Sequence, residues 1–439
     1  MANSYLTRTP GSAGNTKKFT ISAWVKRSYL GSNTSTIFSS WSADSIAGHF
    51  AFRFDGSDRL DLSTWSVNLL TTNRFFKDTN AWYHIVCAVD TDESTANNRV
   101  RFYVNGVEET SFSARNNPSS GQTFSVNNTN SQTVGLNNYS SAAGNMDGYM
   151  SHVAMVDGQQ LTPATFGETD STSGIWKFKS PSGVTWGTNG FHLKFENSGN
   201  LGLDSSGQTN NFTTNGNLRQ AVDTPSNVYA TWNPLIKDAA SLSNGNTTSN
   251  NTSSSNWNRA SGTLANTKGK YYAEFKMTTM EAAQVGIIDV EQAYGTTAQV
   301  RDSSRAYMYK DNGQKGNGGS DSSFGASFTD GDIIGIALDL DNNKIYFSKN
   351  GVWQNSGVPT SGSTGTGSAF NLTDGYFYTF VNGNYDSSGS GKIDANFGNG
   401  YFGTTAITSA GSNGNGSLFE YDVPSGYYAL NTKNINTYG

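Results

Sequence analysis

Cysteine is almost absent from this chain of 439 residues: Cys87 is the only one, so no intrachain disulfide can form. Large extracellular animal proteins usually carry several disulfides, so synthesis in a reducing cytoplasm is the better expectation. Cys87 lies inside the apolar run 85–89, where a thiol normally packs as a small hydrophobe. We therefore predict a buried, unreactive thiol.

Charge is also scarce, because Asp, Glu, Lys and Arg make up 14% of the residues. The 29 basic and 34 acidic residues give a net charge of −5, and no Lys/Arg cluster stands out. Nucleic-acid-binding proteins normally present such a cluster, so nucleic acid is not expected as a partner. The N-terminus lacks a basic region followed by an apolar stretch, and no long apolar run exists. We expect neither a signal peptide nor membrane insertion.

Helical periodicity is missing as well, since no stretch repeats apolar residues at i, i+3, i+4 and i+7. Aromatic residues instead reach 13% and stand in alternating runs separated by Gly, Ser, Thr and Asn. In residues 19–26, Phe19, Ile21 and Val25 share one face and Trp24 lies on the other, as in a half-buried strand. The aromatic content argues against disorder. The composition therefore predicts an all-β protein, and the length favours two domains.

One pattern occurs in both halves of the chain. Residues 99–107 and 344–352 each form an alternating run that ends in Asn-Gly, at Asn105-Gly106 and at Asn350-Gly351. Asn-Gly supplies the two positive-φ residues of a type I′ hairpin turn. An apolar run ending in Asp precedes each copy. Each half is therefore predicted to contain an antiparallel meander.

The order of the expected strands suggests where the domains lie. The predicted boundary falls near 219–228, and the Ser/Asn/Thr tract 238–257 is expected to be a surface loop. We predict domains at 1–219 and 228–402 and a C-terminal extension at 403–439, which is either a clasp strand or a docking segment. The expected strands lie at 19–26, 48–54, 58–62, 82–90, 99–104, 148–156, 270–276, 284–288, 305–309, 332–340, 344–349, 375–381 and 393–397.

The first half resembles a known family. Residues 16–156 are similar to LamG-like, concanavalin A-type jelly rolls, and the stretch 191–212 is expected to complete that roll. The matching motifs are Phe19-Thr-Ile-Ser-Ala-Trp-Val-Lys-Arg27, Trp82-Tyr-His-Ile-Val86, Arg101-Phe-Tyr-Val-Asn-Gly106 and Met146-Asp-Gly-Tyr-Met150.

The second half resembles another family of sandwiches. Residues 268–402 are similar to SPRY domains, above all through Gly331-Asp-Ile-Ile-Gly-Ile-Ala-Leu-Asp-Leu-Asp341 followed by Lys344-Ile-Tyr-Phe-Ser-Lys-Asn-Gly351. The resemblance implies two tandem antiparallel jelly-roll β-sandwiches. The tandem order is similar to virion proteins of tailed bacteriophages, such as tail fibres. That similarity implies a virion-surface protein made in the host cytoplasm, contacts with other virion proteins, and a homo-oligomer, trimeric if it is a fibre.

Signatures of catalysis are lacking. His49, His84, His152 and His192 are scattered along the first half without a metal-binding spacing. His84 lies in an expected strand and His192 in an alternating run, so we expect structural roles for these two. No phosphate loop or Gly-x-Ser-x-Gly motif occurs. The closest acidic pair, Glu108-Glu109, is adjacent in sequence and so lies on opposite strand faces. An enzyme, and glycan hydrolysis in particular, is therefore not expected.

Carbohydrate binding needs only exposed aromatic rings beside polar groups. Aromatic residues in polar loops are the candidate ligand-binding residues. The alternative for each is packing over a sandwich edge or a subunit contact, which is the commoner fate of a single aromatic residue. The candidates are Trp41, Trp65, Tyr139, Trp257, Tyr294 and Trp353.

Clustered carboxylates leave calcium as an open alternative. Asp90, Asp92 and Glu93 form one such cluster, and Asp339 and Asp341 form another. Turn residues that end strands explain them equally well, so no metal or other cofactor is assigned.

The function expected from these observations is attachment to host cells, with a surface glycan or receptor as partner and no enzymatic activity. The alternative is a structural role, in which the sandwiches decorate a capsid or join tail components.

Overall fold

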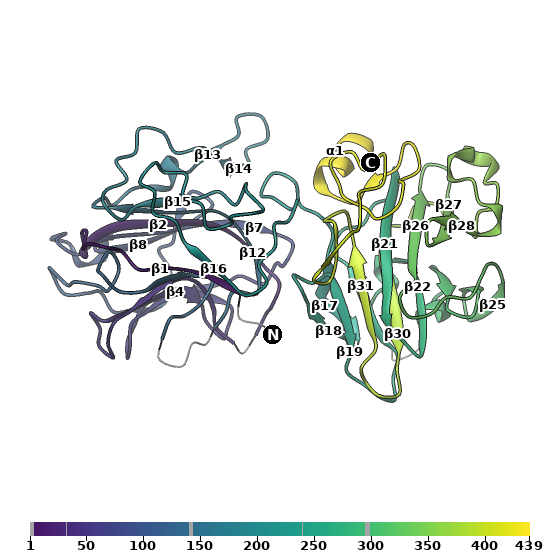
Figure 1. Cartoon of the computed structure of the whole chain (residues 1–439), viewed down its shortest axis with the longest axis horizontal. Coiled ribbons are helices and arrows are strands. Elements are labelled where there is room, and N and C mark those ends of the chain that lie inside the picture. Colours follow the sequence, from purple (N-terminus) through teal and green to yellow (C-terminus); the bar gives the residue numbers. More distant parts are fainter. Residues whose placement is uncertain (1–3, 32, 140–143, 239, 295–298) are drawn as a thin grey trace. The chain divides into compact units, whose positions relative to one another are not determined.

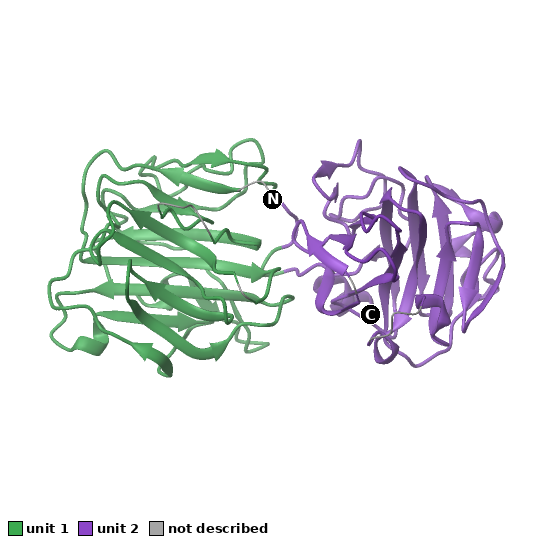
Figure 2. Cartoon of the chain, turned by 90° about the horizontal axis from the view of Figure 1, so that it is seen from below, with its two compact units in different colours: residues 1–220, 224–226 green, residues 221–223, 227–439 purple. Residues whose placement is uncertain are grey.

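The computed structural model describes residues 4–31, 33–139, 144–238, 240–294 and 299–439. Its contacts divide the chain into two compact units, which Figure 2 colours separately. Unit 1 consists of residues 1–220 and 224–226, and unit 2 of residues 221–223 and 227–439. The chain crosses between the units within the segment 219–228. Residues 403–439 belong to unit 2.

Unit 1 contains two large antiparallel sheets, several of whose strands are labelled in Figure 1. The eight-stranded sheet has the order β10 (Phe112–Arg115), β6 (Asn68–Phe75), β5 (Arg59–Ser63), β4 (His49–Phe54), β3 (Ser35–Trp41), β11 (Gln132–Val134), β1 (Tyr5–Arg8) and β16 (Thr213–Asn215). The six-stranded sheet has the order β15 (Phe191–Leu193), β12 (Gly148–Asp157), β2 (Lys18–Arg27), β7 (Trp82–Asp90), β8 (Val100–Val104) and β9 (Val107–Glu108).

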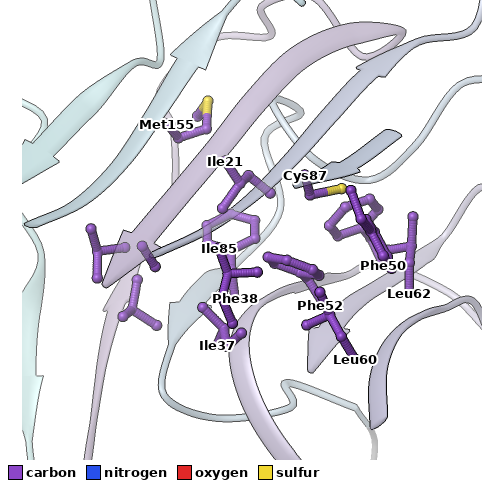
Figure 3. Packing of buried hydrophobic residues seen from close by; sticks show 14 of the residues in the cluster. Ile21, Ile37, Phe38, Phe50, Phe52, Leu60, Leu62, Ile85, Cys87 and Met155 are labelled. Atoms are coloured by element: carbon purple, nitrogen blue, oxygen red, sulfur yellow. The ribbon is translucent and has the colours of Figure 1, made fainter. Parts of the chain in front are cut away.

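The core of unit 1 lies between these sheets. Ile21 and Ile85 of the six-stranded sheet pack against Phe38, Phe50 and Phe52 of the eight-stranded one (Figure 3). The alternation in residues 19–26 thus points inward as predicted. Cys87 lies in the same cluster and is fully buried, as predicted, and burial raises the pKa of its thiol. β15 pairs with β12, so the stretch 191–212 does join this sandwich.

The outer face of the six-stranded sheet carries a second buried layer. The two-stranded ribbon β13 (Gly167–Thr169) and β14 (Trp176–Phe178) supplies part of it. The imidazole of His84 is stacked on the indole of Trp24, with ring centroids 4.9 Å apart, and the indole of Trp176 lies at its edge, with a centroid distance of 6.0 Å. Trp24 is therefore buried even though it points away from the main core.

Unit 2 is a second sandwich. Its seven-stranded sheet has the order β17 (Trp232–Asp238), β20 (Asn258–Gly262), β30 (Tyr378–Tyr385), β22 (Ala282–Asp289), β23 (Ala306–Lys310), β24 (Gln314–Asn317) and β25 (Ser320–Ser323). The nine-stranded sheet runs β18 (Ala240–Ser243), β19 (Thr248–Asn251), β31 (Lys392–Asn396), β21 (Lys270–Thr279), β26 (Ile333–Asp339), β27 (Lys344–Lys349) and β28 (Val352–Trp353), with β29 (Phe370–Asn371) on β27 and β34 (Tyr428–Ala429) on β21. Both sheets contribute to one core that includes Phe275, Ile336 and Phe380.

The C-terminal segment clasps unit 2. β34 pairs in parallel with β21, and α1 (Thr432–Tyr438) follows it as the one α-helix of the described residues. Before these elements, a short ribbon is formed by β32 (Tyr401–Phe402) and β33 (Thr405–Ala406). Tyr272, Tyr346, Phe419 and Tyr427 form a buried layer on the outer face of the nine-stranded sheet. Of the two roles left open for this segment, the clasp strand is the one observed.

The prediction of a surface loop at 238–257 is wrong. β18 and β19 lie within this tract, and β19 pairs with β31. Thr248 and Ser249 are buried, and their hydroxyls donate to Asp394 and Asn382. Polar side chains that satisfy one another can occupy a buried strand, and such a strand lacks the apolar alternation by which strands are recognised.

The two Asn-Gly hairpins form as predicted. Asn105 and Gly106 have φ values of 48° and 83°, and Asn350 and Gly351 have 49° and 80°. These are the positive values of a type I′ turn. Apart from α1, helical turns are short 3₁₀ segments among the described residues, which confirms the all-β class. No described helix has the length and apolar character needed to span a membrane.

Candidate functional site

Three of the six predicted aromatic residues come together in unit 1. Trp41 is the last residue of β3, and its cross-strand partner on β4 is His49. Trp65 lies just after β5, the neighbour of β4, and Tyr139 lies in the segment that follows β11. Directly opposed residues of an antiparallel pair share one face of the sheet, so Trp41 and His49 lie side by side.

The rings of His49, Tyr139 and Trp65 contact one another in series, and Trp41 lies beside them as the cross-strand partner of His49. We call these four residues the aromatic cluster. The Trp65 and Tyr139 ring centroids are 4.7 Å apart at an angle of 44°. The ring of Tyr139 is also 5.7 Å from that of His49. Trp65 is 38% exposed, and Trp41 and Tyr139 are partly exposed. The cluster thus presents aromatic surface to solvent.

His49 anchors the aromatic cluster. It is buried, and its Nε2 lies 3.0 Å from Oδ1 of Asn137, two residues before Tyr139. Burial lowers the pKa of His49, so its imidazole is neutral at neutral pH. A neutral imidazole donates from Nε2 to the Asn137 oxygen and so ties the Tyr139 segment to β4. His49 is a member of the site that the sequence did not suggest.

Polar groups border the cluster. The indole Nε1 of Trp41 donates to Oδ1 of Asp44 at 3.3 Å, and the Asp44 side chain is exposed. Sugars bind by placing an apolar ring face on an aromatic side chain while hydroxyls meet carboxylate, amide or backbone groups. The aromatic cluster offers both kinds of contact within one patch.

The other three predicted residues are not brought together. Trp257 is half-buried against Tyr385, with ring centroids 6.1 Å apart. Tyr294 is 69% exposed. Trp353 is half-buried beside Tyr272, at 6.5 Å, and packs against the layer under the C-terminal segment. For Trp353 the geometry agrees with edge packing rather than with a free platform.

The carboxylates that were considered for catalysis or calcium have other partners. Glu109 accepts from Arg74 at 2.9 Å, and Glu108 lies 3.9 Å from Arg101, so the two face different guanidinium groups.

Asp90 forms an ion pair with Lys18 at 2.6 Å, and Asp339 forms one with Lys270 at 3.0 Å. In the part of the chain that the structure describes, no group of three or more His, Cys, Asp or Glu side chains could hold a metal ion. Asp90 accepts from the backbone N–H of Asp92, and Asp339 accepts from that of Asn342, as residues in turns do.

Three histidines lie on the outer face of the six-stranded sheet of unit 1, where His84 and His192 are buried and His152 is half-buried. His84 accepts from Nε1 of Trp176 at 3.0 Å through Nδ1, and its Nε2 lies 2.8 Å from the Ser22 hydroxyl. Burial lowers the pKa of His84 to about 3. His152 and His192 lie 3.3 Å apart, and burial lowers the pKa of each to about 4. Neutral, enclosed imidazoles of this kind are structural groups, as expected for His84 and His192.

Two family models match parts of the chain. Residues 1–167 match the family model of the concanavalin A-like lectin/glucanases superfamily, and residues 270–381 match that of the SPRY domain. No curated protein sequence matches the chain.

Solved structures similar to this chain include the SPRY domain of human HERC1, at 20% identity over 37% of this chain and 96% of that one, with a TM-score of 0.31. Another human SPRY domain is 15% identical over 36% and 95%, with a TM-score of 0.27. Stonustoxin is 14% identical over 38% and 27%, with a TM-score of 0.28.

Proposed function

We propose that this chain, in which a concanavalin A-like domain precedes a SPRY domain, is a non-enzymatic surface protein of a phage virion that attaches to host-cell glycans. The resemblance of the tandem order to tail-fibre-type proteins suggests the particle. The aromatic cluster of unit 1 is the glycan-binding surface. One observation carries the proposal: Trp65 and Tyr139, which are separated in the sequence, meet at a partly exposed patch beside His49, the cross-strand partner of Trp41.

The geometry of the aromatic cluster suits a sugar chain better than a flat ligand. The rings of Trp65 and Tyr139 contact each other at an angle of 44° and so present a non-planar apolar surface. The neighbouring Asp44 supplies a hydrogen-bond acceptor at the border. A few stacking contacts of about 1 kcal/mol each give only weak binding per site. Several copies on one particle would raise the overall avidity without any new contact.

The test is adsorption of the purified full-length protein to host cells, together with its Trp65→Ala variant. We expect Trp65→Ala to weaken saturable adsorption at least about fivefold, because an exposed stacking ring is removed. Phe75→Ala is the matched control, since Phe75 is 57% exposed in the same unit and lies outside the cluster. Equal adsorption of both variants and the parent, or no saturable adsorption, would refute the proposal.

A structural role is the second candidate, and the hairpin tips favour it. Val107 and Val352, which directly follow the two Asn-Gly turns, are 69% and 67% exposed. Exposed apolar side chains at matching positions of both units suit contacts with other virion proteins. If adsorption is absent while Val107→Asp or Val352→Asp blocks incorporation into particles, this role is the correct one.

A further inference from the structure

A small pocket lies in unit 1 beside β15, an edge strand of the six-stranded sheet, whereas the aromatic cluster lies on the eight-stranded sheet. It has a volume of about 160 Å³, which is less than a drug-sized ligand needs and suits a single sugar residue. The loop that follows β15 encloses it. Phe195 and Leu203 line its apolar part, and Asn197, Asn200 and Ser205 line its polar part.

The loop is closed at its base and is therefore preformed. Leu193 and Asp204 pair as an isolated bridge, and the Asp204 carboxylate accepts from the backbone N–H of His192 at 2.9 Å. Inside the loop, Oδ1 of Asn197 accepts from the backbone N–H of Gly199. A rigid pocket binds without the entropic cost of ordering a loop.

Phe195 holds an unusual backbone conformation at the floor of the pocket. Its φ is +61°, in the left-handed region that a large L-residue rarely adopts. Nε2 of Gln220 donates to the carbonyl oxygens of Phe195 and Glu196, at 2.7 Å and 2.9 Å, and holds them in place. Strained backbone of this kind concentrates at ligand sites, where neighbouring groups enforce it. Leu203 beside it remains 41% exposed.

The charge that lines the pocket comes from Lys194 and Glu196. The Lys194 side chain is 32% exposed, whereas Glu196 is 71% exposed. Their charged atoms are 3.9 Å apart, a loose surface pair that contributes little and that another carboxylate can replace. Burial and the charge of Lys194 lower the pKa of the adjacent His192 to about 4. His192 is therefore neutral, and Lys194 is the cation that a ligand meets.

We infer that this pocket binds one acidic sugar residue, a uronic acid, within a host-surface polysaccharide. The ring of the sugar contacts Phe195 and Leu203, its hydroxyls bond to Asn197 and Asn200, and its carboxylate pairs with Lys194. This inference rests on the proposed glycan-binding function and adds to it a ligand class and a second site. No covalent step is involved.

The test compares two soluble probes, methyl β-glucuronide and methyl β-glucoside, titrated into the full-length protein and followed by NMR. We expect the glucuronide to bind about tenfold more tightly, because the ammonium–carboxylate contact is charge-assisted. Lys194→Gln should abolish that preference, and Leu203→Ser should weaken both sugars. Lys268→Gln, an exposed lysine of unit 2, is the matched control and should change nothing. Gln220→Ala should weaken the glucuronide as a positioning effect while thermal stability of the variant reports on folding.

The outcomes separate this inference from the proposed function. Equal affinity for the two probes, an unaltered preference in Lys194→Gln, or no binding of glucuronide overturns the inference. Trp65→Ala should leave glucuronide binding intact. If Trp65→Ala retains full host adsorption while Lys194→Gln loses the glucuronide preference, the pocket stands and the aromatic cluster fails. If Trp65→Ala loses host adsorption while Lys194→Gln keeps the glucuronide preference, the proposal for the aromatic cluster is supported and the inference about the pocket is refuted.

Discussion

The meanders of the two units use the same hairpin in the same way. In unit 1, Asn105 donates from its backbone to the carbonyl of His84 and accepts the His84 N–H on its side chain, both at 2.8 Å. In unit 2, Asn350 makes the same two bonds with Ile333, at 2.8 Å and 2.9 Å. The asparagine of each turn thus fastens the hairpin to the preceding strand, a role beyond supplying a positive φ.

Two further contacts around the hairpin occur in both units. Lys18 pairs with Asp90 across β2 and β7, and Lys270 pairs with Asp339 across β21 and β26. An aromatic ring closes over each turn glycine. A Cβ on Gly106 would lie 2.6 Å from the ring of Trp176.

A Cβ on Gly351 would likewise lie 2.7 Å from the ring of Tyr421. These rings come from unrelated segments, the β13–β14 ribbon in unit 1 and the C-terminal segment in unit 2. The two units share the hairpin, but different segments pack over it.

The β13–β14 ribbon of unit 1 and the C-terminal segment of unit 2 bury different titratable groups. Unit 1 encloses neutral imidazoles, with His84 stacked on Trp24 and hydrogen-bonded to Trp176. Unit 2 encloses the carboxylate of Glu274, which accepts from the backbone N–H groups of Glu420 and Tyr421, both at 2.8 Å, and from Tyr272 and Asn396. Burial raises the pKa of Glu274 to about 7 despite these donors. The two units therefore bury groups of opposite acid–base character, which makes their stabilities respond to pH in opposite directions.

Acidification from pH 8 to pH 5 should produce the largest difference between the two units in their free energies of unfolding. The unfolded chain protonates His84 near pH 6.5 but the folded chain only near pH 3, so unit 1 loses about 2 kcal/mol at pH 5 from this residue alone. His152 and His192 act in the same direction, and Asp61 and Asp147, whose pKa values burial raises, oppose it.

Glu274 gives unit 2 the opposite pH dependence, so that acid stabilises this unit. Its folded pKa of about 7 exceeds the ordinary value of 4.5, so folding takes up a proton between these values and unit 2 gains about 3 kcal/mol as pH falls. Calorimetry should show the two melting transitions moving in opposite directions. Glu274→Gln should remove most of the shift of the unit 2 transition, and parallel movement of both transitions would contradict the comparison.

Glu274→Ala should have the next largest effect. It leaves two backbone N–H groups and the Tyr272 hydroxyl without their acceptor in a buried site, at a cost of about 3–4 kcal/mol to unit 2. Chemical unfolding should show this loss in the unit 2 transition alone. Glu281→Ala, an exposed carboxylate in the same unit, is the control and should cost well under about 1 kcal/mol. A comparable loss in both variants would mean that Glu274 does not fasten the C-terminal segment.

Alanine at either turn glycine should cost about 3 kcal/mol, from the positive φ and from collision with the covering ring. The matched experiment is a double-mutant cycle. In a Trp176→Ala background, Gly106→Ala should cost only about 1 kcal/mol, because only the backbone term remains. In a Tyr421→Ala background the same should hold for Gly351→Ala. Additive losses would show that the rings do not constrain the turns.

The smallest expected effect concerns binding and has no counterpart in unit 2. Tyr139→Phe keeps the ring and should leave host adsorption within about twofold, whereas Tyr139→Ala should weaken it about fivefold through the lost contact with Trp65. Tyr294→Ala, an isolated exposed ring of unit 2, should have no effect. Loss of adsorption in Tyr294→Ala would show that the binding surface lies in unit 2.

Most of the strands could be predicted because they alternate, as β2 and β27 do, and the hairpins because Asn-Gly has few other uses. β19 could not be predicted, since Thr248 and Ser249 satisfy their hydroxyls inside the sandwich rather than with water. The individual rings of the aromatic cluster were found as aromatic residues in polar segments. Their meeting was not, because it depends on the register that sets Trp41 opposite His49.

By itself, the sequence determined the class of the fold, the place of the division and the two hairpins, because these follow from local periodicity and turn chemistry. Tertiary structure decided which aromatic residues share a surface, which ring covers each turn glycine, and why Glu274 has a raised pKa. Those outcomes depend on contacts between segments far apart in the chain. Local patterns do not encode such contacts, and packing selects them only when the whole sandwich closes.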